Sequence, residues 1–492
     1  MNVFSNHLSS IVLQKEVNIT QMAAFCKIDR SSMYKIIHGT RKPPSESLVE
    51  LISLYLKLTP EESSLLMENY RIVLMGEEKY CRRKAAMAFL KKCFADSPVL
   101  TPPSYLSLPD LLFGEMKDDI EVMLGKSNVL GAIVSIILEE RKLSSPSVLF
   151  RMKPDKMVLD LIRTLCVQKN PDQDNPIQIQ HIVAADENKE LMKSDISNLN
   201  LLCTLLPALM SVPNYDLRYF YANLSTGNTS FAFMVYAVIT RNCVLQVSEN
   251  LEFGILHRQP EIVEFFRNTY MDILSGSIPV TMEIRDIRDM LYCGSQRRNG
   301  NSFVTFHMGF CMSYMVDEYL LEKYVKKDLP NRSSLLKAAL EINEKDRQHF
   351  KTAQATIIVS HKGIIDFMKT GILPGGPAEL CSPIEPSDRL LLLKKYIEMI
   401  RSCPAALHII REPFGNTSSG NQVWLDESLA IILLQNSPGV RRVLMLRDSG
   451  LLSLLNDFLH NIPEDICIPP AESLEILQDI YTEYSKKATA AD

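Results

Sequence analysis

The sequence predicts a multidomain chain with an all-α head of five short helices followed by a large α+β body. Two observations favour this. Helix caps and apolar residues at helical spacing crowd residues 1–75, whereas later segments mix alternating, strand-like patterns with helical ones. The length of 492 residues, 46% of them hydrophobic, is sufficient for several domains with sizeable cores.

Two helices separated by a tight turn are predicted between residues 18 and 43. Asn18 and Asp29 are suitable N-caps, because their side chains can accept hydrogen bonds from the first-turn backbone N–H groups. Gly39 is the expected C-cap of the later of these two helices, which is the third helix of the head. The positions of that helix expected to face outward are Arg30, Ser31, Ser32, Tyr34 and Lys35.

Three further helices complete the predicted head. The fourth opens near Ser45, and the fifth opens at Thr59, which is followed by Pro60 at the first helical position and Glu62 at the capping-box position. The first helix precedes the tight turn, and its apolar positions are Phe4, Leu8, Ile11 and Val12.

These five helices resemble the Cro/C1-type (Xre-like) helix-turn-helix family of bacterial and phage repressors. The family's usual turn glycine is Lys27 in this chain, and Ile19 and Ile37 replace a frequent glutamine and a frequent acidic residue. The resemblance implies that the outward positions of the third helix contact DNA bases, and that Arg41 and Lys42 hold the DNA backbone. The residues that carry the resemblance are Met22-Ala23, Ile28 to Met33, Ile36 and Gly39 to Pro43.

The charge is unevenly distributed along the chain. Residues 1–92 contain 14 Lys/Arg against 9 Asp/Glu, whereas the remainder contains 39 against 49. The basic N-terminal segment is consistent with nucleic acid as a partner. The acidic remainder argues against binding of nucleic acid along the whole chain. The basic run at 79–92 has two interpretations, a solvated helix with an apolar face or a linker helix that touches phosphates or pairs with a second copy.

The remaining chain is divided into a basic helix and Pro-rich linker at 76–108, a first α+β module at 109–279, a helical connector at 280–352 and a second α+β module at 353–492. The residues after Tyr236 and those after Leu429 both read as strand, turn, strand, break and helix. This pattern indicates two related modules, although any α/β chain offers such a similarity by chance. Strands are expected at 177–183, 215–222, 231–240, 243–247, 303–308, 356–359, 407–411, 429–434 and 440–446, and helices at 109–124, 128–142, 155–168, 261–274, 363–369, 388–402 and 451–462.

No pattern in the sequence indicates catalysis. There is no GxxxxGK[ST] phosphate loop, no GxGxxG after a strand and no GxSxG elbow. The 11 cysteines and nine histidines are scattered, which fits core residues in a reducing cytosol better than a metal site. We therefore expect no enzyme activity, catalytic residue, metal or cofactor, and we assign no cofactor-binding residue.

The expected location is the cytoplasm. The N-terminus is a helical domain and not a signal peptide, and the most apolar stretch, Phe231 to Ile239, is too short to span a bilayer.

The leading hypothesis is a one-component, sequence-specific transcriptional regulator, such as a repressor, that binds double-stranded DNA as a homodimer. Its body would sense a small molecule, peptide or protein and change the spacing of the two heads. The alternative is a nucleic-acid-directed effector, or a protein-interaction factor, of a defence or mobile-element system.

Overall fold

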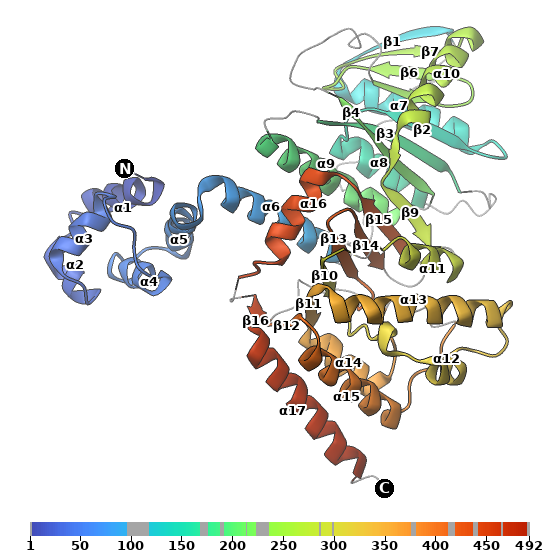
Figure 1. Cartoon of the computed structure of the whole chain (residues 1–492). Coiled ribbons are helices and arrows are strands. Elements are labelled where there is room, and N and C mark those ends of the chain that lie inside the picture. The colour runs from blue at the N-terminus through green and yellow to red at the C-terminus, as the bar shows by residue number, and fades with distance from the viewer. Residues whose placement is uncertain are drawn as a thin grey trace. The chain divides into compact units, whose positions relative to one another are not determined.

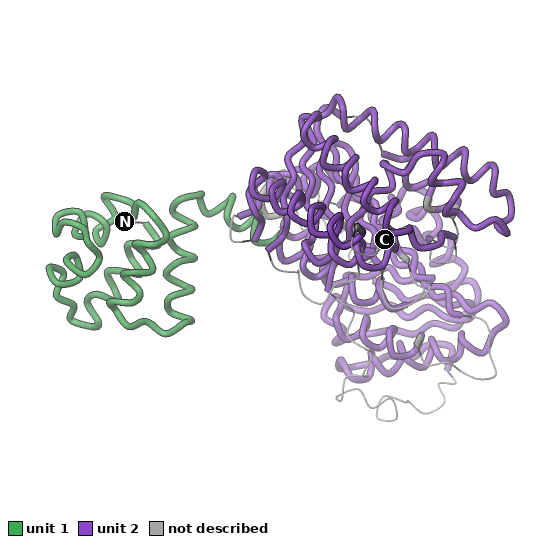
Figure 2. Tube along the Cα trace, turned by 90° about the horizontal axis from the view of Figure 1, so that it is seen from below, with its two compact units in different colours: residues 1–85 green, residues 86–492 purple. Residues whose placement is uncertain are grey.

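The computed structural model divides into two compact units, Met1–Ala85 and Ala86–Asp492 (Figure 2). The chain passes from one unit to the other within helix α6 (Glu77–Phe94). The structure describes residues 2–95, 118–167, 176–186, 191–212, 214–222, 236–284, 287–297, 300–374, 380–411, 419–435, 441–463 and 466–489. The prolines expected in the linker, Pro98 to Pro109, lie outside these residues.

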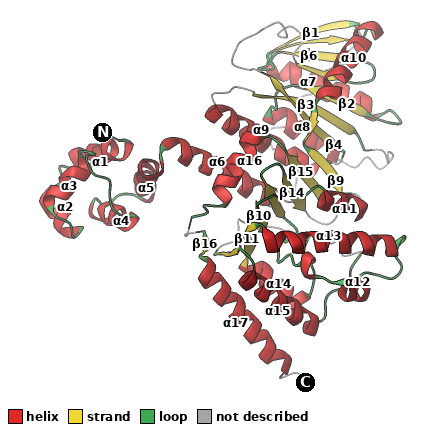
Figure 3. Cartoon of the chain, viewed as in Figure 1, coloured by secondary structure: helices red, strands yellow, loops and turns green. Residues whose placement is uncertain are grey.

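The first unit is helical throughout its described residues (Figure 3). The five expected helices are present, and the start of α6 follows them. Their bounds are α1 (Val3–Gln14), α2 (Ile19–Phe25), α3 (Arg30–Ile37), α4 (Glu46–Tyr55) and α5 (Pro60–Met75). All five contribute to one apolar core, which includes Leu8, Met22, Met33, Ile52 and Leu66.

The helix ends follow the capping chemistry of the sequence. Asn18 accepts from the N–H groups of Thr20 and Gln21 at 3.0 and 3.2 Å. Thr59 and Glu62 form the expected reciprocal capping box at the start of α5. Caps of this kind are short-range, so a local sequence pattern is sufficient to predict them.

The turn between α2 and α3 requires one residue with a left-handed backbone conformation. Lys27 has φ 55°, where a residue with a Cβ atom is strained and glycine is not. This is the position at which the resembling family carries glycine, so the conformation is kept although the residue differs.

The second unit contains two sheets of eight described strands each (Figure 1). The first sheet has the order β1-β7-β6-β5-β2-β3-β4-β8, in which β2, β3 and β4 are parallel neighbours and the other neighbours are antiparallel. Its strands are β1 (Ile120–Leu124), β2 (Ser147–Arg151), β3 (Gln178–Asp186), β4 (Tyr215–Ala222), β5 (Tyr236–Ile239), β6 (Val244–Val247), β7 (Phe253–His257) and β8 (Ile278–Pro279), and its helices are α7 (Lys126–Arg141), α8 (Lys156–Val167), α9 (Leu191–Ser211) and α10 (Pro260–Gly276).

The second sheet has the order β16-β12-β11-β10-β13-β14-β15-β9, with β10, β11 and β12 parallel. Its strands are β9 (Thr281–Ile284), β10 (Ser302–His307), β11 (Gln354–Ser360), β12 (Ala405–Ile410), β13 (Gln422–Asp426), β14 (Ala430–Gln435), β15 (Arg441–Leu446) and β16 (Cys467–Ile468). Its helical segments are α11 (Ile287–Ser295), the 3-10 turn η4 (Ser313–Met315), α12 (Glu318–Tyr324), α13 (Arg332–Thr352), α14 (His361–Thr370), α15 (Pro386–Ser402), α16 (Ser449–Leu459) and α17 (Pro470–Thr489).

The second sheet repeats the first strand for strand. Replacing β1 to β8 by β9 to β16 in sequence order reproduces the neighbours and their directions. The body is therefore built from two α+β modules with one strand order.

The structure of the body differs from the expectation in three places: a module boundary, one predicted helix and the correspondence between the modules. The segment 280–352, expected as a connector, supplies β9 and β10 to the second sheet. The helix expected over 109–124 is wrong at its described end, where 120–124 form β1. The sequence pattern paired β5 with β14, whereas the sheet order pairs β5 with β13. Of the strand expected at 231–240, residues 231–235 lie outside the described part.

One extended segment joins the two sheets. It pairs with β4 as β8 and with β15 as β9, and Val280 lies between the two strands. The Val280 N–H donates to the Leu217 carbonyl at 2.9 Å, and the Val280 carbonyl accepts from the Met445 N–H at 2.8 Å. Helices α9 and α16 also lie side by side there (Figure 1).

Arg442 on β15 is buried at this junction, with 2% of its surface exposed. Its Nη2 donates to the Val212 carbonyl at 2.8 Å, while Nε and Nη1 have no hydrogen-bond partner among the described residues. Burial lowers the pKa of Arg442, which reflects the cost of a charge removed from water. This side chain is therefore a costly contact between the modules.

We predict that Lys27→Gly stabilises the head by roughly 1 kcal/mol, because glycine removes the left-handed strain. Amide hydrogen exchange in α2 and α3 of the full chain should slow about fivefold. Lys27→Ala, which keeps a Cβ atom, serves as the control and should change little. Faster exchange in the glycine variant would contradict the strain at this turn.

We predict that Arg442→Met leaves the melting temperature unchanged or raises it, because an apolar side chain of similar volume often replaces a buried charge without loss. Thermal unfolding of the full chain measures this. Arg442→Ala should lower the melting temperature, since it also leaves a cavity. Equal destabilisation by Met and Ala would show that the guanidinium itself holds the junction.

Candidate nucleic-acid interface

The orientation of α3 is fixed from its buried side. Met33, Ile36 and Ile37 belong to the head core. The buried Ser5 hydroxyl of α1 donates to the Ile36 carbonyl at 3.1 Å, which ties α1 to the end of α3. The opposite face of α3 is consequently directed away from the core.

The predicted DNA-contacting residues differ in exposure. Tyr34 is half-buried and Ser32 is buried, so these two side chains are less accessible to DNA than the other predicted residues. The exposed ones are Arg30, Ser31, Lys35, Arg41 and Lys42. The exposed set carries four positive charges close to the two ends of α3.

A row of planar groups runs along the outward face of α3. The Arg30 guanidinium lies 5.4 Å from the centroid of the Tyr34 ring. The Tyr34 ring stacks on His38 with centroids 6.0 Å apart and planes inclined by 17°. His38 is exposed and was not among the predicted residues, although its spacing of four from Tyr34 was the signal that could have identified it.

Ser32 positions Arg41 and does not face outward. The Arg41 Nη1 donates to the Ser32 hydroxyl at 2.9 Å, and the Arg41 backbone N–H donates to the Lys35 carbonyl at 3.1 Å. These two bonds hold the basic loop against α3. The sequence pattern did not separate this inward position from its outward neighbours.

Lys42 is engaged within the head. Its Nζ donates to the Val73 carbonyl at 2.7 Å, in the last turn of α5. A cation is favourable at a helix C-terminus, where carbonyl groups have no partner within the helix. Lys42 therefore caps α5 in addition to its predicted contact with the DNA backbone.

The start of α3 carries an acid. The Asp29 carboxylate accepts from the Ser32 N–H and the Ser31 hydroxyl, each at 2.7 Å. Hydrogen bonds from Ser32 and Ser31 hold the pKa of Asp29 well below its usual range. The carboxylate is thus ionised and satisfies the helix N-terminus, which leaves the basic loop at 41–42 as the more favourable place for a phosphate.

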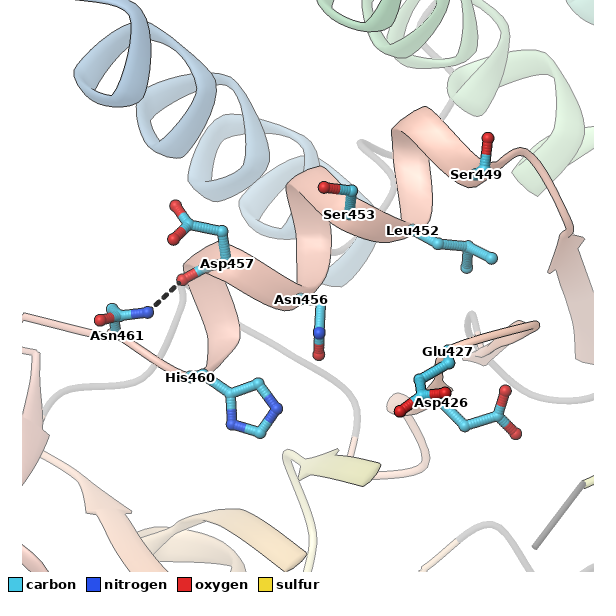
Figure 4. Close-up of a pocket in the computed structure, with 9 residues that line it drawn as sticks. All are labelled: Asp426, Glu427, Ser449, Leu452, Ser453, Asn456, Asp457, His460 and Asn461. Atoms are coloured by element: carbon cyan, nitrogen blue, oxygen red, sulfur yellow. Dashed lines mark hydrogen bonds between the residues drawn. The ribbon is translucent and has the colours of Figure 1, made fainter. Parts of the chain in front are cut away.

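The body contains a polar pocket of about 470 Å³ on α16 (Figure 4). Asp426, at the end of β13, and the adjacent Glu427 lie across from the helix. The residues that line the pocket from α16 and just beyond it are Ser449, Leu452, Ser453, Asn456, Asp457, His460 and Asn461. None of these residues was predicted from sequence, because they come from distant segments without a motif.

Two side chains of the pocket are tied to the fold. The Asp426 Oδ1 accepts from the backbone N–H groups of Ser428 and Leu429, at 2.7 and 3.0 Å, and so closes the turn between β13 and β14. His460 Nδ1 lies 3.0 Å from the Thr356 hydroxyl, and burial lowers the pKa of His460. No nucleophile paired with a base is evident among the residues lining it.

Within the described residues no group of His, Cys, Asp and Glu side chains is arranged to hold a metal ion. The same residues include no helix with the length and apolar character needed to cross a membrane.

No family model and no curated protein matches this chain. Two solved structures are similar to it at 12% and 10% sequence identity. The phosphatidylserine synthase of Haemophilus influenzae Rd KW20 has a TM-score of 0.23 and covers 75% of this chain and 94% of its own. TrmBL2, an archaeal chromatin protein described as showing a novel mode of DNA binding, has a TM-score of 0.20 and covers 57% and 95%. Likeness at this level assigns neither a family nor an activity.

Proposed function

We propose that this protein is a transcriptional regulator that reads DNA with its head. The observation that supports this most is the outward face of α3, on which Arg30, Tyr34, Lys35 and His38 are presented while the opposite face is buried. A helix held in this way by a preceding helix and a tight turn is the element that helix-turn-helix proteins place in a major groove.

The side chains suit the two tasks of such an interface. Arginine and lysine make the commonest specific contacts, with guanine edges, and phosphates are bound by cations and backbone N–H groups. Arg30 and Lys35 lie on the helix itself and are assigned to bases. Arg41, which Ser32 holds against α3, is assigned to the backbone.

The body is assigned a sensing role. Two modules of one strand order share the extended segment at Val280 and also pack together through α9 and α16. A ligand that prefers one arrangement of the modules would shift their equilibrium. The pocket of about 470 Å³ on α16 is within the size range of small-molecule sites, roughly 300–1,000 Å³, and its polar lining suits a polar effector.

We predict that Arg30→Ala/Lys35→Ala weakens binding of the full chain to its preferred DNA roughly tenfold or more, since each base contact is worth about 1–3 kcal/mol. The preferred DNA is taken from the region upstream of its own gene or selected from a random-sequence pool. Fluorescence anisotropy across a salt series measures both affinity and salt slope.

The matched control is Lys142→Ala/Lys394→Ala, which removes two exposed positive charges from the body. This variant should bind like the wild type. If wild-type protein binds its best sequence no better than scrambled DNA, or if the α3 variant binds normally, the regulator proposal fails. The search then moves to protein partners or to an effector activity.

A further inference from the structure

The edge strand of the first sheet carries an exposed apolar row. Ile120, Val122 and Leu124 on β1 are 48%, 61% and 67% exposed, and Phe253, the neighbour of Leu124 on β7, is 41% exposed. These side chains are on the same sheet face as Val244 of β6, which packs under α10. The exposed row therefore lies on the part of this sheet face that α10 does not cover.

The backbone groups of the same three residues point outward. Arg258 N–H donates to the Asp119 carbonyl, and Gly125 N–H donates to the Glu252 carbonyl, so the odd-numbered residues of this stretch bond to β7. In an antiparallel ladder the alternate residues face the other way. Ile120, Val122 and Leu124 thus direct both N–H and C=O away from β7, and no described strand lies on that side.

We propose that β1 pairs with β1 of a second copy of this chain, in an antiparallel ladder centred on Val122. The two-fold axis sets Val122 opposite Val122 of the second copy and Ile120 opposite its Leu124, so the exposed row continues across both chains. An edge strand that combines free backbone groups with a flat apolar row is suited to such pairing.

Charge supports a second copy in this register. Glu121 faces Met123 of the other chain, whereas a ladder centred on Glu121 would set two carboxylates opposite each other. The register also brings the acidic start of one strand, Asp118 and Asp119, toward the end of the other, where Lys126, whose Nζ lies 3.2 Å from the Asp155 carboxylate of its own chain, begins α7. Both effects favour the arrangement centred on Val122.

The proposed pairing would make β1 the dimer surface of the regulator. Its biological role rests on the proposed function. Its test requires no DNA, so its failure is distinguishable from failure of DNA binding. A continuous sheet across two bodies would hold two chains in one two-fold assembly, as a helix-turn-helix dimer on a palindromic operator requires.

The test is oxidative cross-linking of full-length Val122→Cys. Directly opposed residues of a hydrogen-bonded pair are about 5.5 Å apart at Cα, which suits a disulfide. Leu124→Cys is the matched control, because four residues separate it from its symmetry mate along the strand, roughly 14 Å. Wild-type protein, with Cys81 exposed, gives the background.

We expect a covalent dimer from Val122→Cys and background cross-linking from Leu124→Cys. Sedimentation of Val122→Pro provides a second readout. Proline removes an outward N–H that the edge strand of the monomer does not use but that the proposed ladder between two copies requires. This variant should sediment as a monomer under conditions in which the wild type is a dimer. Equal cross-linking of the two cysteine variants, or a wild-type sedimentation profile for Val122→Pro, would overturn the proposal.

Discussion

The packing of α3 into the head core is the constraint on which the functional account depends. Burial of Met33, Ile36 and Ile37, with the Ser5 hydroxyl on the Ile36 carbonyl, leaves only one face of the helix for a partner. That face carries Arg30, Lys35 and an aromatic row. The strained turn at Lys27 and the ionised Asp29 cap contribute by fixing where the helix begins.

In the body, two sheets of one strand order share a single extended segment at Val280. The junction also includes the packing of α9 against α16, the buried Arg442 and the Tyr221–Asp448 hydrogen bond. Small shifts there would be transmitted to whole sheets, because packed modules move as units. This is the physical basis on which a bound effector could bias the assembly.

The sequence predicted the head better than the body. Caps such as Asn18 and Thr59 act within a few residues, whereas β1 pairs with the distant β7 alone. Strands β7 and β13 each pair with one distant strand in addition to a hairpin neighbour. Missing β7 and β13 shifted the predicted module correspondence by one strand. On α3, helical spacing correctly placed Arg30 and Lys35 on the exposed face, but it did not show that Ser32 turns inward to Arg41 or that Lys42 caps α5.

Hydroxyl-radical footprinting of the full chain on a selected operator would test the central claim most directly, that two copies read DNA through paired α3 helices. We expect two protected patches related by a two-fold axis and spaced one DNA turn apart, about 34 Å, or a multiple of it. A single protected patch, or uniform protection independent of sequence, would contradict it.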